Sequence, residues 1–337
     1  MLGLHKWLQS AHLNDTVQWA TRCSSRRTAQ VLSGLILAVS ILAAESSLGC
    51  ANVGSAMANV VRQSLPSTAK VIVDSRKRNA LRKIPGSSSI AGLRKGLTGR
   101  TKRQVLYDFS TCAVVGNGGA MKSREFGHAI ESHKTVFRLN QAPTKGYEKH
   151  VGKKTTFRLI NKLWVRKYMG ASSYLPLSMG TTLLLARSNN PSDMLQMAQA
   201  HRSRSGVHVA KSSLEVAMAS RSIFNAFKRQ LECRGKYKSQ GGDTPTTGMY
   251  ALVVALTLCD KVSVYGFGNS PGGAYQYYVL KGTERSKGNP VHSFNVEKTL
   301  VQQLHNEGLL NFCTEKSRDD CGYQGEKTSK SRVNVQA

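Results

Sequence analysis

Residues 112–139 read CAVVGNGGAMKSREFGHAIESHKTVFRL, and this stretch decides the expected fold. Two short apolar runs, Cys112–Val115 and Thr135–Leu139, predict strands, and the longer segment between them, Lys122–Ser132, predicts a helix. A strand, a helix and a second strand in this order are typical of a βαβ unit with parallel strands.

The same alternation continues toward the C-terminus. Further strands are expected at Thr156–Ile160, Thr182–Ala186, Val207–Ala210 and Lys261–Tyr265, and further helices at Pro191–His201, Ser213–Cys233, Thr247–Cys259 and Asn295–Gly308. The predicted fold class is α/β, with a Rossmann-like, mostly parallel sheet flanked by helices. Because 337 residues are too few for two full enzyme domains, we expect one catalytic domain, over 105–315.

The chain is strongly basic, with 48 Lys and Arg against 19 Asp and Glu, a net charge of +29. Such a surface attracts nucleic acid, anionic membrane or a nucleotide sugar. Between Ala51 and Gln104 there are twelve basic residues, one acid, Asp74, and no aromatic residue for base stacking. We therefore predict a flexible basic stem over 49–104, no nucleic-acid partner, and a disordered basic tail over 316–337.

An apolar run, Val31–Ala44, follows Arg26 and Arg27. This run alone is short for a spanning helix, which needs about 20 residues, so we interpret the longer segment 28–48 as a signal-anchor. The preceding positive charges predict a cytosolic segment over 1–27 and a lumenal remainder, hence a single-pass Golgi membrane protein. A cleaved signal peptide, an organellar transit sequence and a buried core helix remain alternatives.

Cysteine usage agrees with a lumenal catalytic domain. Six of the seven cysteines follow the apolar run: Cys50, Cys112, Cys233, Cys259, Cys313 and Cys321. An even number suits an oxidising compartment, although free buried thiols are also open. No pair has the C-x-x-C spacing of a zinc site.

Two turns could bind a phosphate. The glycines of Gly116-Asn117-Gly118-Gly119 follow a predicted strand and allow a close approach of a phosphate to backbone N–H groups. Asp243–Gly248 opens an apolar helix whose first N–H groups have no intrahelical acceptor. Tight turns and ordinary helix caps are the competing explanations.

Both turns lie in segments that resemble motifs of a known protein family. Residues 112–161 (CAVVGNGGAMKSREFGHAIESHKTVFRLNQAPTKGYEKHVGKKTTFRLIN) resemble the long sialyl motif of eukaryotic sialyltransferases, and 244–269 (TPTTGMYALVVALTLCDKVSVYGFGN) the short motif. Tyr275-Gln276-Tyr277-Tyr278 is similar to the third motif, and His292 with Glu297 to the very short H-x4-E motif. The order and spacing of four motifs identify the chain as similar to that family, which implies the A-type glycosyltransferase variant of the fold.

The resemblance implies a role for each matching residue. Asn117, Gly118, Asn140, Gln276 and Tyr277 would bind the donor, with Asn117 and Asn140 on the CMP phosphate and ribose. Thr246, Thr247 and Gly248 would receive the cytidine and the donor carboxylate region. Cys112 and Cys259 match a disulfide pair, and His292 matches the general base. An imidazole, with an ordinary pKa of about 6.5, can accept the proton of an attacking hydroxyl, and Glu297 would support this region.

The implied reaction transfers sialic acid, or a Kdo-like sugar, from a CMP ester to a glycan hydroxyl on a glycoprotein or glycolipid, with inversion. No cofactor and no metal are expected, because the sequence has no D-x-D and helix N-termini can receive a monophosphate. Lys122, Arg124 and Arg138 are candidates for steering the anionic donor.

Two departures from the family pattern matter. Gln276 stands where the third motif often has His, and an amide cannot carry a proton. Tyr275 or Tyr277 would then supply the missing donor. Gly118 stands where Ser is usual. The runner-up hypotheses are therefore a degenerate family member that binds nucleotide or glycan without turnover, and a basic protein that binds nucleic acid or a membrane surface.

Overall fold

The computed structural model describes residues 56–67, 71–74, 82–83, 89–94, 104–170, 175–186, 190–201, 206–235, 241–268, 274–279 and 291–325. All of them belong to one compact unit, Ala56–Ala337. The predicted cytosolic segment 1–27 and signal-anchor 28–48 lie outside the described residues. Among the residues that are described, no helix combines the length and apolarity needed to cross a bilayer.

An eight-stranded sheet with the order β1-β9-β8-β7-β6-β5-β10-β11 forms the centre of the unit. Its strands are β1 (Ile72–Asp74), β5 (Thr111–Val115), β6 (Thr135–Leu139), β7 (Phe157–Ile160), β8 (Thr182–Leu185), β9 (His208–Ser212), β10 (Lys261–Tyr265) and β11 (Asn311–Cys313). Every neighbouring pair is parallel except the edge pair of β1 and β9, which is antiparallel. The predicted mostly parallel sheet is confirmed.

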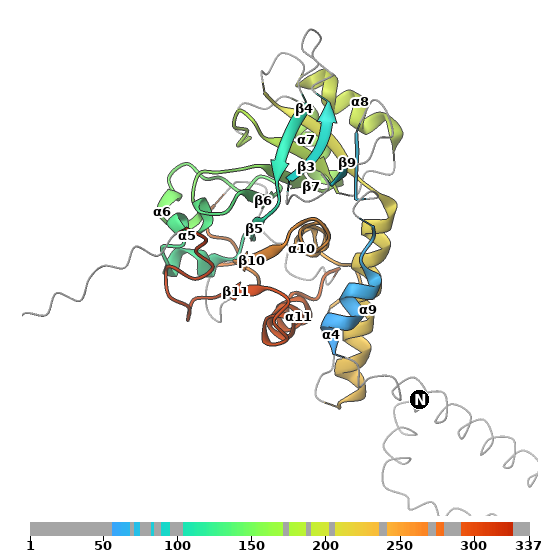
Figure 1. The fold of residues 1–337 in the computed structure, drawn as a ribbon, viewed down its shortest axis with the longest axis vertical. Coiled ribbons are helices and arrows are strands. Elements are labelled where there is room, and N and C mark those ends of the chain that lie inside the picture. Colours follow the sequence, from blue (N-terminus) through green and yellow to red (C-terminus); the bar gives the residue numbers. More distant parts are fainter. Residues whose placement is uncertain are drawn as a thin grey trace, which may run out of the picture. The chain divides into compact units, whose positions relative to one another are not determined.

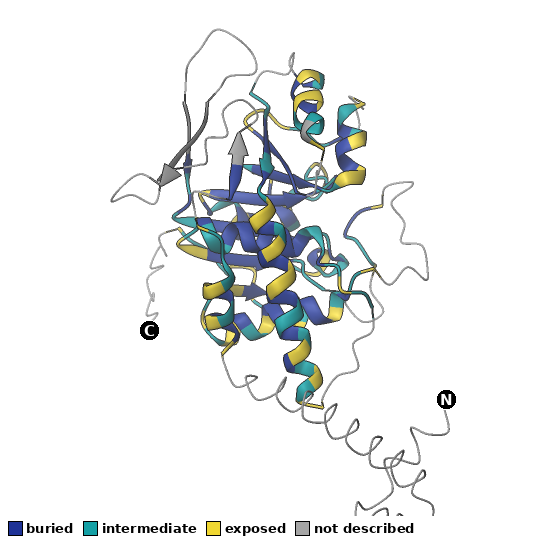
Figure 2. Ribbon diagram, turned by 90° about the vertical axis from the view of Figure 1, so that its right-hand side faces the viewer, coloured by how far each residue is buried: buried dark blue, intermediate teal, exposed yellow. Residues whose placement is uncertain are grey.

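Helices cover both faces of this sheet (Figures 1 and 2). One face packs against α4 (Met57–Ser64), α9 (Leu214–Cys233), α10 (Thr247–Leu258) and α11 (Phe294–Asn306), and the other against α5 (Gly127–Glu131), α7 (Lys162–Met169) and α8 (Pro191–Ala200). Along β5, Cys112 and Val114 belong to the first core and Ala113 and Val115 to the second. Burial on both faces explains why the parallel strands are almost continuously apolar.

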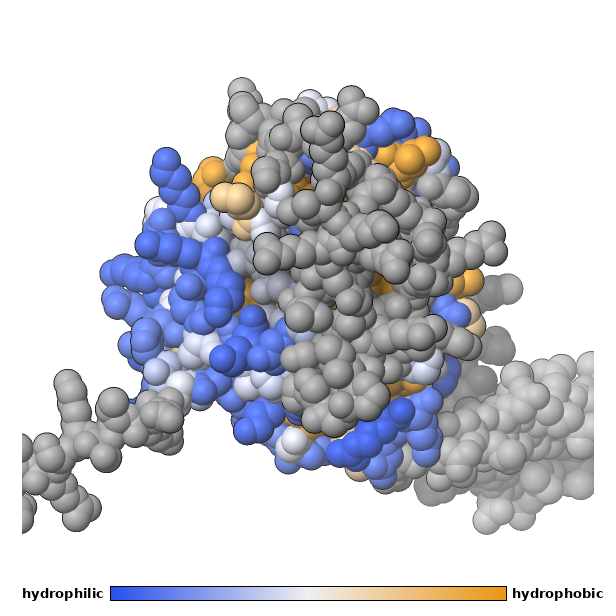
Figure 3. Space-filling view, turned by 45° about the horizontal axis from the view of Figure 1, so that its top comes forward, coloured by the Kyte–Doolittle hydropathy of each residue, from blue (hydrophilic) through white to orange (hydrophobic). Residues whose placement is uncertain are grey.

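On the face shown in Figure 3, hydrophobic side chains occur in scattered patches between polar ones. A second, antiparallel sheet of β2 (Arg82–Lys83), β3 (Ser89–Arg94) and β4 (Gln104–Asp108) completes the strands. Two short helices, η2 (Gly119–Ser123) and α6 (Glu148–Val151), follow β5 and β6 along the chain.

The direction in which strands are added to the sheet reverses once. From β5 to β9 each new strand joins the same side, and the chain then returns through α9 and α10 to place β10 and β11 on the other side of β5. The connections after β5 and β10 therefore start side by side at the carboxyl edge and lead to helices on opposite faces of the sheet, α5 and α11. In open α/β sheets this is the position where ligands bind.

The stem predicted over 49–104 does not hold for two described segments. Met57 and Val61 of α4 are buried, and α4 packs on α9; Val71 and Ile72 are also buried where β1 pairs with β9. Glu307 accepts hydrogen bonds from the first backbone N–H groups of α4. The basic composition of 49–104 gave no sign of α4, because the few apolar residues of this short amphipathic helix are recognised only by their position on one face.

Residues 316–325 of the predicted disordered tail are held in place by the folded unit, and 326–337 lie outside the described residues. Cys321 forms a disulfide with Cys313, and its carbonyl accepts a hydrogen bond from the Tyr265 hydroxyl at 2.9 Å. The backbone N–H of Gln324 donates to Ser132 Oγ at 2.9 Å. A cross-link and backbone hydrogen bonds hold this polar segment, and neither leaves a hydrophobic pattern in the sequence.

The helix predicted over Lys122–Ser132 is two pieces, η2 and α5. Arg124, between them, has an extended backbone. A Cβ on Gly127 would lie 2.1 Å from the carbonyl oxygen of Glu148, so the first residue of α5 lies directly against the backbone of α6. Tertiary packing against α6 therefore interrupts a segment whose local pattern favours one helix.

Candidate functional site

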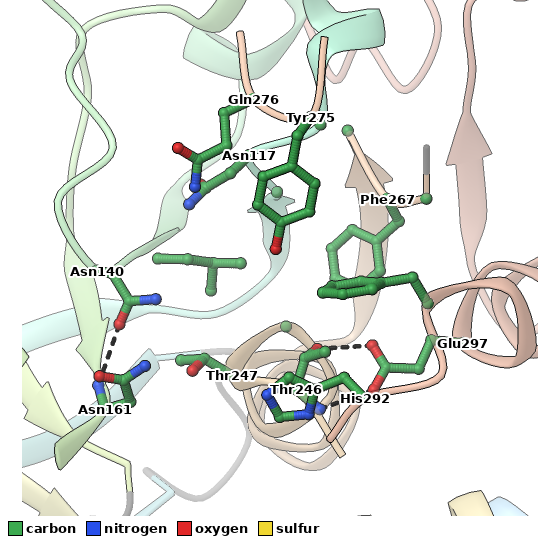
Figure 4. A pocket seen from close by; sticks show the side chains of 17 residues that line it. Asn117, Asn140, Asn161, Thr246, Thr247, Phe267, Tyr275, Gln276, His292 and Glu297 are labelled. Atoms are coloured by element: carbon green, nitrogen blue, oxygen red, sulfur yellow. Dashed lines mark hydrogen bonds between the residues drawn. The ribbon is translucent and has the colours of Figure 1, made fainter. Parts of the chain in front are cut away.

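A pocket of about 180 Å³ lies at the carboxyl edge of the sheet, at the reversal between β5 and β10. Figure 4 shows side chains converging on it from loops far apart in the sequence. The lining includes the predicted residues Asn117, Gly118, Asn140, Thr246, Thr247, Gly248, Gln276 and His292. The structure thus brings together every predicted catalytic and donor-binding residue except Tyr277.

The glycine-rich turn after β5 packs against the turn after β10. The N–H of Gly116 donates to the Tyr265 carbonyl at 2.7 Å, and that of Gly118 to the Gly266 carbonyl at 3.0 Å. A Cβ on Gly116 would lie 2.4 Å from the Gly266 oxygen. The glycines therefore permit this contact between two turns, and the Gly116 and Gly118 N–H groups already have protein acceptors, contrary to the expectation that they meet a phosphate.

Gly118, which stands where the family usually has serine, is also in close backbone contact. Its φ of −57° suits any residue, but a Cβ would lie 2.8 Å from the carbonyl oxygens of both Gly266 and Gly268. A side chain here requires the backbone to move, so in this chain the position is shaped for glycine.

Asn117 presents its amide to the pocket (Figure 4). Its Nδ2 donates to the Tyr278 hydroxyl at 3.2 Å, which fixes the orientation of the amide. Its Oδ1 is buried and has no hydrogen-bond partner among the described residues. A buried acceptor without a donor is costly, so Asn117 suits a ligand that donates a hydrogen bond at this point.

The N-terminus of α10 forms the opposite wall. Thr246 is the N-cap, and its Oγ1 accepts from the Met249 N–H at 3.3 Å. The next residues, Thr247 and Gly248, begin the first turn and line the pocket. Unpaired N–H groups and the helix dipole make a helix start favourable for an anion.

Glu297 fixes this helix start from α11. Its Oε1 accepts from the Thr246 N–H at 2.7 Å, and its Oε2 accepts from Thr246 Oγ1 at 2.6 Å (Figure 4). Glu297 as a whole is 3% exposed. Glu297 therefore holds Thr246 in its capping geometry, in agreement with the predicted supporting role.

His292 lies half-buried at the pocket, two residues before α11. Its Nδ1 is 2.6 Å from the Thr244 carbonyl oxygen, which can only accept. Nδ1 therefore carries the proton, and in the neutral ring Nε2 holds the lone pair. This tautomer is the one that a base acting through Nε2 requires.

The residues of the third motif, 275–278, lie partly in the pocket lining and partly in the core. Gln276 forms an isolated β-bridge with Gly118, and both Gln276 and Tyr275 line the pocket. Tyr277 is 1% exposed, does not line the pocket, and donates its hydroxyl proton to the Pro143 carbonyl at 2.6 Å. Burial raises the pKa of Tyr277 to about 12, so this hydroxyl stays protonated. Of the two tyrosines that were candidates for a missing donor, only Tyr275 reaches the pocket.

The predicted steering residues lie outside the pocket lining. Arg138 is fully buried and donates to the carbonyls of Val151 and Lys154 at 2.7 and 2.9 Å. Burial lowers the pKa of Arg138 to about 10. Arg124 donates to the Glu315 carbonyl at 2.7 Å, and Lys122 is exposed. The described pocket lining contains no Lys or Arg, so neutral groups and the helix start would meet an anion.

The predicted disulfide is present. Cys112 of β5 is bonded to Cys259, which ends α10, and this bond joins the two segments that resemble the long and short motifs. Over the described ranges, no three His, Cys, Asp or Glu side chains gather as metal ligands would.

Sequence reasoning missed several lining residues, among them Asn161, Phe267 and Phe294. Asn161 follows directly after β7, and the carboxyl ends of parallel strands share one edge of the sheet. That placement is a usable signal for Asn161. Phe267 stands two residues after β10 at the same edge, whereas Phe294 begins α11 and has no comparable signal in the sequence.

Comparison with known proteins gives a family. The model of glycosyltransferase family 29 (sialyltransferase) matches residues 86–309. The Mus musculus protein CMP-N-acetylneuraminate-beta-galactosamide-alpha-2,3-sialyltransferase 2 is 33% identical over 198 residues, which are 57% of this chain and 53% of that protein. Sialyltransferase-like protein 1 of Oryza sativa subsp. indica is 28% identical over 208 residues, 58% of this chain and 52% of that protein.

Among solved structures, one described as a mammalian sialyltransferase is similar at 23% identity and a TM-score of 0.44, over 61% of this chain and 70% of that one. The chain spans about half the length of the curated relatives it matches.

Proposed function

Because the chain belongs to glycosyltransferase family 29, the sialyltransferases, we propose that it transfers sialic acid from CMP-sialic acid to a glycan hydroxyl. The observation that carries this proposal is one pocket at the carboxyl edge, where residues of all four motifs meet. It offers two asparagine amides, a helix start and an imidazole whose tautomer suits a base.

In the proposed reaction the acceptor hydroxyl oxygen attacks the anomeric carbon of the donor. His292 Nε2 takes the hydroxyl proton, the bond from the anomeric carbon to the phosphate oxygen breaks, and CMP leaves with both bonding electrons. A single displacement of this kind inverts the anomeric carbon. The short bond from Nδ1 to the Thr244 carbonyl supports the imidazolium that forms.

The leaving phosphate would be met by neutral groups. The first turn of α10 supplies N–H groups and the helix dipole, and Gln276 and Tyr275 face the same pocket. We assign the Tyr275 hydroxyl as the proton-bearing donor near the phosphate, because Tyr277 bonds to Pro143 instead. Metal-independent transfer remains part of this proposal.

The acceptor and the cellular location are further parts of the proposal. The acceptor is a glycan on a glycoprotein or glycolipid, and the domain acts in the Golgi lumen behind an N-terminal membrane anchor. The disulfide between Cys112 and Cys259 supports an oxidising compartment.

The test measures CMP release from CMP-sialic acid and, separately, from CMP-Kdo, with a mixed glycan acceptor pool. We expect acceptor-dependent release with CMP-sialic acid. His292→Ala should lower kcat by at least about 100-fold while the dissociation constant for CMP changes little, because only proton transfer is lost. His292→Gln is the matched control for side-chain volume and should be equally inactive. Undiminished release by both variants would remove His292 from the mechanism, and turnover with CMP-Kdo alone would change the donor.

A second function is favoured by one observation, the presence of Gln276 where the family often has His. This function is binding of nucleotide or glycan without turnover. CMP binding without release from either donor would establish it. If the parent is active, Gln276→His should then be no faster than the parent, because Tyr275 already serves the phosphate.

A further inference from the structure

Asn140, at the carboxyl end of β6, has an unusual backbone conformation. Its φ is 49°, and among the described non-glycine residues no other has a positive φ. Residues in this left-handed region persist only where the surroundings fix them, and they are often found at functional sites. Asn140 also lines the pocket, with its carboxamide nitrogen directed inward (Figure 4).

Four hydrogen bonds fix Asn140. Its N–H donates to the Leu159 carbonyl at 2.7 Å, and its Oδ1 accepts from the Asn161 N–H at 3.1 Å. Its carbonyl oxygen accepts from Arg158 Nη1 at 2.9 Å and from the Tyr168 hydroxyl at 3.2 Å. Because Oδ1 is occupied, the amide cannot flip, and Nδ2 is the group that faces a ligand.

Two of these supports are side chains, and both belong to residues outside the pocket lining. Arg158 on β7 is 1% exposed, and its Nη1 also donates to the Ala142 carbonyl at 3.0 Å, so one nitrogen spans the turn after β6. Tyr168 on α7 is fully buried, and burial raises the pKa of its hydroxyl, which therefore stays protonated as a donor. Its other acceptor, the Pro176 carbonyl, is more distant at 3.5 Å.

We propose that Arg158 and Tyr168 are positioning residues that hold Asn140 in the left-handed turn and aim its carboxamide at the nucleotide. They act through the Asn140 carbonyl and do not touch the ligand. The inference rests on the proposed function only for the identity of the ligand, CMP. It also gives α7, which matches none of the sequence motifs, a defined part in donor binding.

Tyr168→Phe is the cleanest test, because it removes one hydroxyl and keeps the ring in the core. The dissociation constant for CMP, measured by titration calorimetry, should rise about three- to tenfold, since the carbonyl loses one of two buried donors. The matched control is Tyr107→Phe. The Tyr107 hydroxyl is also buried and pairs with Thr182 Oγ1 at 2.6 Å, at the opposite, amino edge of the sheet. This control should leave CMP affinity within about twofold of the parent.

A double-variant cycle separates positioning from general loosening of the fold. In an Asn140→Ala background, Tyr168→Phe should change the dissociation constant by less than about twofold, because the amide that it aims is gone. Arg158→Lys should weaken CMP binding in the parent and much less in the same background, because an ammonium does not reproduce the guanidinium fork. In turnover with CMP-sialic acid, Tyr168→Phe should raise the donor KM and leave kcat nearly constant.

Unchanged CMP affinity in Tyr168→Phe, or an undiminished effect in the Asn140→Ala background, would overturn the inference. A parent that binds CMP without turnover leaves it intact, because the readout is binding. If the parent does not bind CMP, the ligand that both proposals share is wrong. If the parent transfers the sugar but Tyr168→Phe leaves its CMP affinity unchanged, only the positioning role is refuted.

Discussion

Glu297 lines the pocket and shapes it by fixing the N-terminus of α10. Both carboxylate oxygens bond to Thr246, one to its N–H and one to its hydroxyl. The same hydroxyl caps α10, so the carboxylate, the cap and the anion-favouring helix start form one unit.

Glu297→Ala should lower the free energy of unfolding by about 2 kcal/mol, because it leaves the Thr246 N–H without its acceptor. CMP affinity should fall with it. Glu297→Gln keeps one acceptor and one polar group at the same place and is the milder, matched variant. Thermal denaturation and CMP titration of both variants check this prediction, which fails if Glu297→Ala matches the parent in both measurements.

His133 makes stability depend on pH. Its ring is fully buried, Nδ1 donates to the Ala129 carbonyl at 2.9 Å, and Nε2 has no partner among the described residues. The Tyr265 ring lies perpendicular to the imidazole, and the Lys154 ammonium donates a hydrogen bond to the His133 carbonyl. Burial lowers the pKa of His133 from 6.5 to about 4.

The unfolded chain therefore binds a proton in a pH range where the folded protein does not. The stabilising contribution of neutral His133 is complete above pH 6.5 and is lost as the pH falls toward 4, by about 3 kcal/mol in total. Urea denaturation of the parent and of His133→Asn between pH 7 and pH 4.5 should show a flatter dependence in the variant. Parallel curves for the two proteins would contradict the assignment.

At the scale of elements, the pocket exists because two strand-end turns approach each other. The turn after β5 donates backbone hydrogen bonds to the carbonyls of Tyr265 and Gly266, and Gly119 lies beside the Ala274 backbone near the third motif. The glycines after β5 are therefore needed for close contact between these turns, whether or not a ligand is bound.

Gly119→Ala should disrupt this arrangement, because a Cβ would lie 1.9 Å from the Ala274 carbonyl oxygen. We expect a loss of about 3 kcal/mol in stability and a large loss of CMP affinity. Gly170→Ala is the matched control, since its φ is −71° and its nearest atom would be 3.5 Å away. Melting temperatures of the two variants within about 1 °C of each other would refute the close contact as the reason for glycine.

At the scale of the whole folded unit, two disulfides join parts of the chain that are very different distances apart in the sequence. Cys112 and Cys259 are 147 residues apart, and Cys313 and Cys321 are 8 apart. Closing the longer loop removes far more conformational freedom from the unfolded chain.

The double variant Cys112→Ser/Cys259→Ser should therefore lose about 5 kcal/mol of stability, against about 2.5 kcal/mol for Cys313→Ser/Cys321→Ser, from loop-closure entropy. Guanidinium denaturation of both variants under oxidising conditions measures the difference. Equal losses would show that local packing, and not loop length, sets the contribution of each bond.

The sequence by itself determined the parallel α/β sheet and most of the pocket. Strands buried on both faces are almost continuously apolar, and the glycine-rich turn that holds Asn117 follows such a strand at the carboxyl edge of the sheet. The resemblance to the sialyl motifs added Asn140, Gln276 and His292, which line the pocket, and the Cys112–Cys259 disulfide that it implied is confirmed.

Only the tertiary structure decided which neighbouring side chains reach the pocket and what holds them there. Tyr275 lines it while Tyr277 bonds to Pro143, a choice made by packing against the core. The supports of the Asn140 carbonyl come from residues 18 and 28 positions later, and α4 joins the core through contacts with α9. Periodicity records which face of an element is buried, but contacts between elements depend on distances that no local pattern encodes.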